Sequence, residues 1–113
     1  MEKQFWITLF ADSSDETLAQ ITTAFVGKSI NIGQLRAQSS LLPTLMQYDI
    51  EVSVKPEALK DLKKMLNNAS TVHKLLTYEA KDRNAPKIKD KIKDTLKTVA
   101  RRKQSYLNMR VGA

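Results

Sequence analysis

The sequence predicts an α+β fold, in which two helices cover one face of a four-stranded antiparallel sheet and a basic helix follows at the C-terminus. Four segments have the apolar pattern of β-strands, and two segments between them have apolar residues at helical spacing. The order of these six segments is β-α-β-β-α-β, which is the ferredoxin-like arrangement. The charge of the chain also changes abruptly near residue 81, which sets the last third apart.

The first strand is expected at about residues 4–11. Apolar side chains occupy both of its faces, so both faces need to be covered by other parts of the protein. The side chains on the two faces are Phe5, Ile7 and Leu9 on one, and Trp6, Thr8 and Phe10 on the other.

The first helix is expected to begin after a turn at residues 12–15 and to end at Gly27. Ser13, with Glu16 three residues later, has the pattern of a capping box. The apolar stripe that this helix would bury consists of Leu18, Ile21, Thr22 and Phe25.

The second strand is expected at about residues 31–39 and the third at about residues 46–54. Apolar positions in the second strand change parity around Gly33, which predicts a bulge or bend at this glycine. The third strand alternates regularly, so it has one apolar and one polar face. These faces consist of Tyr48, Ile50, Val52 and Val54, and of Asp49, Glu51 and Ser53.

The second helix is expected to begin at Pro56 and to continue to about Asn67, and the fourth strand covers about residues 72–80. The apolar stripe of this helix consists of Leu59, Leu62 and Leu66. Because both helices lie on one face of the sheet, the other face stays open. The residues expected on that open face are Trp6, Phe10, Asp49 and Glu51.

The charge distribution divides the chain. Residues 1–80 contain eight basic and nine acidic residues, whereas residues 81–113 contain eleven basic and three acidic ones. The whole positive excess therefore belongs to the last third. We expect a globular domain at residues 1–80, a linker at residues 81–86 and a basic helical tail at residues 87–113, with Pro86 in its first turn.

The tail is expected to be helical over residues 87–107, with one apolar stripe at Ile88, Ile92, Leu96 and Val99. An isolated helix of this length is marginally stable in water, so the stripe needs a surface on which to pack. The open face of the sheet offers Trp6 and Phe10 for the stripe, and Asp49 and Glu51 for the lysines. This face can belong to the same chain or to a partner chain, and both arrangements remain open.

The densest basic cluster of the tail is Arg101-Arg102-Lys103. This cluster would remain exposed after the helix packs on the sheet. It could bind an acidic protein, or it could bind the phosphate groups of a nucleic acid. A lysine-rich helix with interspersed aspartates can also be simply a solvated helix. RNA binding by the sheet itself is disfavoured, because Asp49 and Glu51 on its open face would repel phosphates.

Residues 29–36 read Ser-Ile-Asn-Ile-Gly-Gln-Leu-Arg and follow a strand and a helix that ends at Gly27. This succession, with its second strand entered through Ile30-Asn31-Ile32, resembles the first half of an ACT domain, a small regulatory module that usually senses amino acids. The resemblance covers about residues 4–80. It implies a ligand site between the loop after the first strand and the start of the second, generally at a dimer interface.

The positions that match this family's site are Asp12, Ser13, Ser14 and Asn31. Amides at a helix N-terminus can bind a carboxylate, and the oxygens of Asp12 and Asn31 can accept from an ammonium group. The loop departs from the Asp-x-Pro-Gly pattern that is frequent in the family, because it contains neither proline nor glycine. The alternative interpretation is that the loop only caps a helix and that Asn31 only completes a turn.

Composition excludes several classes of function. The chain contains no cysteine and one histidine, His73, so no thiolate nucleophile, nucleophile–base pair or metal-binding set can be identified. His73 is expected to be structural or exposed. We therefore expect no enzyme and no cofactor. The longest apolar stretches are too short to span a membrane, the N-terminus lacks the pattern of a signal peptide, and a cytoplasmic location fits these features.

The leading hypothesis from the sequence is a non-catalytic ACT-like regulatory or interaction module, a homodimer that binds an amino acid or docks to an enzyme or regulator. The alternative is a nucleic-acid-associated protein that binds through its basic tail and dimerises through its globular part. A third hypothesis is a regulatory subunit that has lost ligand binding and has kept assembly.

Overall fold

The computed structural model describes the backbone of residues 1–40 and 44–111 and the side chains of residues 1–40 and 44–102. The elements follow the predicted order, and the C-terminal helix is present. Their bounds are β1 Lys3–Asp12, α1 Asp15–Gly27, β2 Ile32–Ser39, β3 Leu45–Val54, α2 Pro56–Asn67, β4 Val72–Glu79, the 3₁₀ turn η1 Ala80–Asp82 and α3 Pro86–Val111.

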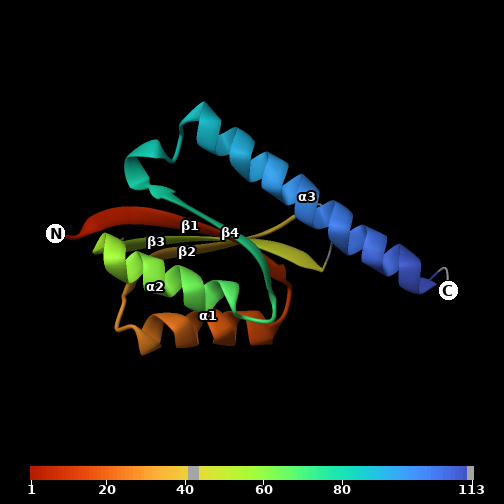
Figure 1. Ribbon diagram of the computed structural model, residues 1–113, viewed down its shortest axis with the longest axis horizontal. Helices are drawn as coiled ribbons and strands as arrows, with labels where there is room; N and C mark the ends of the chain where they lie inside the picture. Colours follow the sequence, from red (N-terminus) through yellow and green to blue (C-terminus); the bar gives the residue numbers. More distant parts are fainter. Residues whose placement is uncertain (41–43, 112–113) are drawn as a thin grey trace.

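The four strands form one antiparallel sheet in the order β2-β3-β1-β4. Figure 1 shows α1 and α2 together on one face of this sheet and α3 running across the other face. The predicted α+β, ferredoxin-like fold class is therefore confirmed. No helix in the described part of the chain is long and apolar enough to cross a membrane.

The main core lies between the sheet and the helices α1 and α2. The apolar faces predicted for the first and third strands both point into it, and the stripe predicted for the second helix is buried there as well. Apolar burial of this kind is the main force that holds a helix against a sheet. The largest fully buried side chains of this main core are Ile7, Leu9, Ile21, Phe25, Ile50, Val52, Leu62 and Leu66.

Two details predicted for the first helix are wrong. Its N-cap is Ser14 rather than Ser13, because the Ser14 hydroxyl accepts a hydrogen bond from the amide of Thr17 at 3.3 Å. Leu18 is 43% exposed and Thr22 is exposed. The buried residues are Thr17, Ile21, Ala24 and Phe25.

Thr17 and Ala24 are buried in α1 although they are less apolar than Leu18, which is exposed. The Thr17 hydroxyl donates to the carbonyl oxygen of Asp12 at 2.7 Å, which satisfies this polar group inside the protein. The small Ala24 lets α1 approach its neighbours closely. Hydrogen bonding and close packing thus outweigh the hydropathy of single residues.

The bulge predicted at Gly33 is confirmed. Ile32 is opposite Val52 and Gln34 is opposite Glu51, so Gly33 is the additional residue in β2. A Cβ atom on Gly33 would lie 3.2 Å from the Glu51 carboxylate and 3.3 Å from its carbonyl oxygen. Glycine therefore allows β2 and β3 to approach each other at this point.

The outer face of the sheet is covered by α3 of the same chain (Figure 1). Phe10 and Leu45 are fully buried and pack against Val99 and Ala100. Ile92 and Leu96 are partly buried at the edge of this second cluster.

Trp6 lies on the same face of the sheet and is 5% exposed. The guanidinium group of Arg83 covers its ring at 3.6 Å from the centroid, which is a cation–π contact.

The expected pairing of Asp49 with the lysines of the tail is wrong. Asp49 is buried and accepts hydrogen bonds from the Thr8 hydroxyl at 2.7 Å and from Gln47 Nε2 at 3.1 Å. None of the ion pairs in the described part of the chain includes Asp49, Glu51 or a residue of α3. Burying a lysine ammonium group is costly, and neutral donors already satisfy this carboxylate.

The same polar network continues towards η1. The hydroxyl groups of Thr8 and Tyr78 are 3.1 Å apart, and Arg83 Nη1 donates to the Tyr78 hydroxyl at 3.0 Å. Near Phe10 the outer face is apolar, and near Trp6 it carries the hydroxyl groups of Thr8 and Tyr78. The segment after β4 covers the first part with α3 and the second with Arg83.

Packing of α3 should contribute to the stability of the domain. The double substitution Ile92→Asp and Leu96→Asp places two charges in the second cluster, and we expect it to lower the free energy of unfolding by about 3 kcal/mol and the thermal midpoint by roughly 10 °C. Thr98→Asp, at an exposed position of the same helix, serves as control and should change the midpoint little. Thermal unfolding followed by circular dichroism measures both. An unchanged midpoint in the double variant would show that the packing of α3 does not stabilise the domain.

The hydroxyl group of Thr8 should matter more than its volume. Thr8→Val keeps the shape but leaves the buried Asp49 carboxylate without its shortest hydrogen bond, and we expect a loss of about 1–3 kcal/mol. The control is Thr77→Val on the neighbouring β4, because the Thr77 hydroxyl has no hydrogen bond in the described structure. Chemical denaturation measures both variants. Equal losses in the two would contradict the proposed role of the hydroxyl.

Candidate functional site

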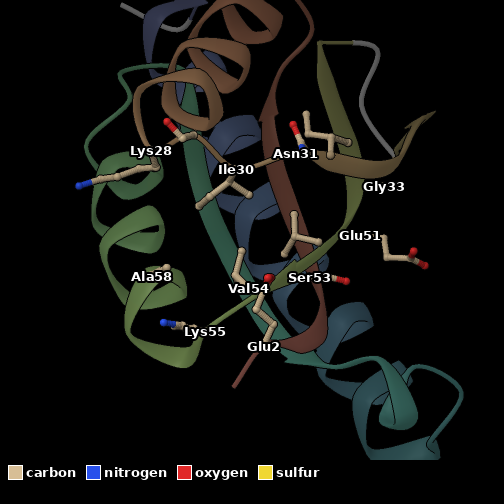
Figure 2. Close-up of a pocket in the computed structure, with 13 residues that line it drawn as sticks. Glu2, Lys28, Ile30, Asn31, Gly33, Glu51, Ser53, Val54, Lys55 and Ala58 are labelled. Carbon is tan, nitrogen blue, oxygen red and sulfur yellow. The ribbon is translucent and has the colours of Figure 1, made fainter.

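A cavity of about 560 Å³ lies at the end of the sheet where β2 begins and β3 ends. The connection between α1 and β2 forms one wall, and the end of β3 with the start of α2 forms the other (Figure 2). Residues from four separate parts of the chain therefore line it. They are Glu2, Lys28, Ser29, Ile30, Asn31, Ile32, Gly33, Glu51, Val52, Ser53, Val54, Lys55 and Ala58.

The cavity combines an apolar middle with charges of both signs. Figure 2 shows Ile30 and Val54 in its middle, with Lys28 on one side and Glu51 on the opposite side. Lys55 adds a second basic group. A ligand that carries a positive and a negative group on a small aliphatic body is complementary to this lining.

The turn after α1 positions Asn31 at this cavity. The amides of Ser29 and Ile30 donate to the carbonyl oxygens of Val26 and Phe25, both at 3.0 Å, and so close the end of the helix. Ser29 has φ 55°, in the left-handed region that non-glycine residues seldom adopt. Backbone strain of this kind persists only where the surrounding structure imposes it. The direction in which the chain enters β2 is therefore fixed.

The structure separates the four residues that the sequence grouped as a ligand site. Asn31 lines the cavity, but Asp12 is opposite Leu45, whereas Ile32 is opposite Val52. Leu45 and Val52 are seven residues apart on β3, which corresponds to about 23 Å along the strand. Residues 12–14 and Asn31 thus lie at opposite ends of the sheet within one chain.

The loop residues have other contacts. Ser14 caps α1, and the Asp12 carboxylate lies 2.7 Å from Nε2 of His73 on β4. This pair could not be predicted from local patterns, because the two residues are 61 positions apart and meet only through the pairing of β1 with β4. Both side chains are partly exposed. In the described part of the chain no group of three or more His, Cys, Asp and Glu residues could hold a metal ion.

The remaining predicted residues lie along α3 and the face beneath it. Trp6, Phe10 and Val99 are buried, and Ile88, Ile92 and Leu96 are partly buried. Arg101 and Arg102 are exposed, and the side chain of Lys103 lies outside those that the structure describes.

Sequence reasoning missed most of the cavity residues. Lys28, Glu51, Lys55 and Ala58 have ordinary surface patterns, and only the strand register and the position of α2 bring them together. The available signal was the parity change at Gly33, because a bulge in an edge strand often lies beside a functional site.

No protein-family model matches this sequence, and no relative was found among curated proteins. Solved structures, in contrast, show a clear likeness in fold. The ACT domain of GTP pyrophosphokinase from Chlorobium tepidum has a TM-score of 0.59 at 15% identity, over 69% of this chain and 100% of that chain.

Two further neighbours are regulatory or small subunits. The acetolactate synthase small subunit from Thermotoga maritima has a TM-score of 0.62 at 14% identity, over 75% of this chain and 50% of that chain. The regulatory subunit of aspartate kinase from Thermus thermophilus has a TM-score of 0.53 at 16% identity, over 67% of this chain and 50% of that chain. At these identities the likeness concerns the fold. The chain thus has the ACT-domain fold that its second strand suggested.

Proposed function

We propose that this chain is a non-catalytic regulatory module that acts as a homodimer and binds a small ligand of the amino-acid type at the start of β2. The observation that carries this proposal is the cavity that contains Asn31, because its lining is apolar in the middle and carries both signs of charge. The likeness in fold to the ACT domain and to the regulatory subunit named above supports it.

The lining accounts for each part of such a ligand. The ammonium groups of Lys28 and Lys55 attract a carboxylate, while the side-chain oxygen of Asn31 accepts a hydrogen bond from an ammonium group. Ile30 and Val54 contact an aliphatic side chain.

Dimerisation is proposed through the free edge of β2. All eight residues of this strand are exposed, and β2 pairs with β3 along one edge only. Leu35 is 41% exposed and lies opposite the core residue Ile50, so it points to the side of α1 and α2. An exposed edge strand with apolar side chains favours pairing with another strand.

Helix α1 extends this apolar surface. Leu18 is 43% exposed and Val26 is 71% exposed, and with Thr22 between them they form one row at four-residue spacing. This row lies on the other side of α1 from Gln20 and Thr23, which line a hollow together with Met65 of α2. A second copy could therefore cover the row and the edge of β2 together.

An antiparallel pairing of two β2 strands would also reunite the predicted ligand residues. β1 and β2 run in the same direction, because both are antiparallel to β3. The start of one β2 would then lie beside the end of the other, where its own chain carries residues 12–14. In this arrangement Asp12, Ser13 and Ser14 of one copy complete the cavity that contains Asn31 of the other.

Ligand binding is tested by thermal unfolding with each of the twenty amino acids at 10 mM. A ligand with a dissociation constant of about 0.1 mM stabilises the folded state by about 2.7 kcal/mol and raises the midpoint. Asn31→Ala should abolish this rise and leave the midpoint of the free protein nearly unchanged. Asn84→Ala, an exposed asparagine outside the cavity, should keep the response. If no amino acid raises the midpoint, the module assembles without such a ligand.

Dimerisation is tested by light scattering at about 50 μM. The wild-type protein should have the mass of a dimer, and Leu35→Lys should give a monomer, because a lysine in the centre of the edge would have to be buried. Met65→Lys on α2 is the matched control, since Met65 is 37% exposed but lies away from β2. A monomeric wild type, or equal effects of both substitutions, would contradict pairing through β2.

A further inference from the structure

We propose that the solvent side of α3, together with Lys74 of β4, binds the phosphate backbone of duplex nucleic acid without reading its sequence. This inference is independent of the proposed ligand and rests on the surface that docking of α3 creates.

When α3 packs on the sheet, one side of the helix is buried and the other side is exposed to solvent. The apolar residues Ile92, Leu96, Val99 and Ala100 face the sheet, so the basic residues face solvent. Over residues 87–102 seven basic and two acidic side chains are exposed. The acidic ones are Asp90 and Asp94, and the basic ones are Lys87, Lys89, Lys91, Lys93, Lys97, Arg101 and Arg102.

Among the residues whose side chains the structure describes, none of these cations forms an ion pair. The ion pairs of the described residues join Lys3 and Lys81 to Glu79 and His73 to Asp12, and none involves α3. Asp49, the buried carboxylate of the outer face, is already bonded to Thr8. The positive charge of α3 is therefore available to a partner.

One row of cations repeats at four-residue intervals. Lys89, Lys93, Lys97 and Arg101 follow each other about every 6 Å over a length of about 18 Å. Like charges at this spacing destabilise a helix, whereas alternating charges stabilise it. Asp90 and Asp94, each three residues before a lysine of this row, offset part of the repulsion, and a line of phosphates would relieve the rest.

A second feature adds donors from another element. A hollow of about 200 Å³ between α3 and β4 is lined by Lys74, Asp94, Thr95, Thr98, Val99 and Arg102. Lys74 and Arg102 approach it from different elements, and the Thr95 hydroxyl adds a neutral donor. Asp94 is the acidic member of this lining. Two cations and a hydroxyl around one hollow suit a phosphate group.

The composition of the surface favours nucleic acid over a protein partner. Protein interfaces depend on buried aromatic or apolar anchors, and the solvent side of α3 has none among residues 87–102. The outer-face aromatics are also unavailable for stacking on bases, because Trp6 is 5% and Phe10 0% exposed. Binding through phosphates alone, with no stacking, indicates a duplex rather than a single strand.

The test is binding of the full chain to a 20-base-pair DNA duplex, measured by fluorescence anisotropy between 50 and 200 mM salt. Each phosphate contact contributes about 0.9 to the slope of log affinity against log salt. Replacing Lys97, Arg101 and Arg102 by Gln should weaken binding at least tenfold at 50 mM salt and reduce this slope by about 3. Lys74→Gln should weaken it several-fold and reduce the slope by about 1.

The matched control is the triple substitution Lys60→Gln, Lys63→Gln and Lys64→Gln on α2, which removes the same charge from the opposite face of the sheet. It should change the affinity less than twofold. Equal losses in both triple variants would show that net charge alone attracts the duplex, and the proposal would be wrong. It would also be overturned by no binding of the wild type at 50 mM salt, or by tighter binding to single-stranded DNA or to polyglutamate.

Discussion

Because β1 is buried on both of its faces, the sheet needs a layer of structure on each side. Phe5, Ile7 and Leu9 lie in the core beneath α1 and α2, whereas Trp6 and Phe10 lie on the opposite face. A sheet with helices on only one side would leave these two aromatic rings in water, at a cost set by their large apolar area. The helix α3 covers Phe10 and Arg83, just before it, covers Trp6, so the segment after β4 is a structural layer of the domain and not only an appendage.

The way in which α3 is held decides what the chain presents to solvent. Its apolar residues meet Phe10 and Leu45 near one end of the sheet, and Arg83 covers Trp6 near the other. Between them the buried Asp49 is satisfied by neutral groups, so the lysines of α3 are not drawn inward. The same packing that stabilises the sheet therefore leaves the solvent side of α3 with seven exposed basic and two exposed acidic side chains over residues 87–102.

Closure of the outer face also determines where other contacts can form. Stacking of two sheets face to face is blocked, and the exposed edge of β2 with the row on α1 becomes the apolar surface available to a second copy. The cavity at the start of β2 adjoins this edge, so a second copy there would lie beside the proposed ligand site. If a ligand binds in this cavity, it would change the affinity between the two copies, and dimerisation would change the affinity for the ligand by the same factor. The basic side of α3 lies on the far face and remains free for a different partner.

Local periodicity and hydropathy were enough to predict the element order, the parity of β1 and β3, the bulge at Gly33 and the need to cover Trp6 and Phe10. They did not determine the buried side of α1, since Thr17 is stabilised by a bond to Asp12 that forms only in the folded chain. The His73–Asp12 pair, the neutral partners of Asp49 and the distance between Asn31 and residues 12–14 were likewise decided by tertiary structure. Strand register brings together or separates residues that are far apart in sequence. Side-chain patterns within single strands indicate which face a residue occupies, but not which residue of the neighbouring strand lies opposite it.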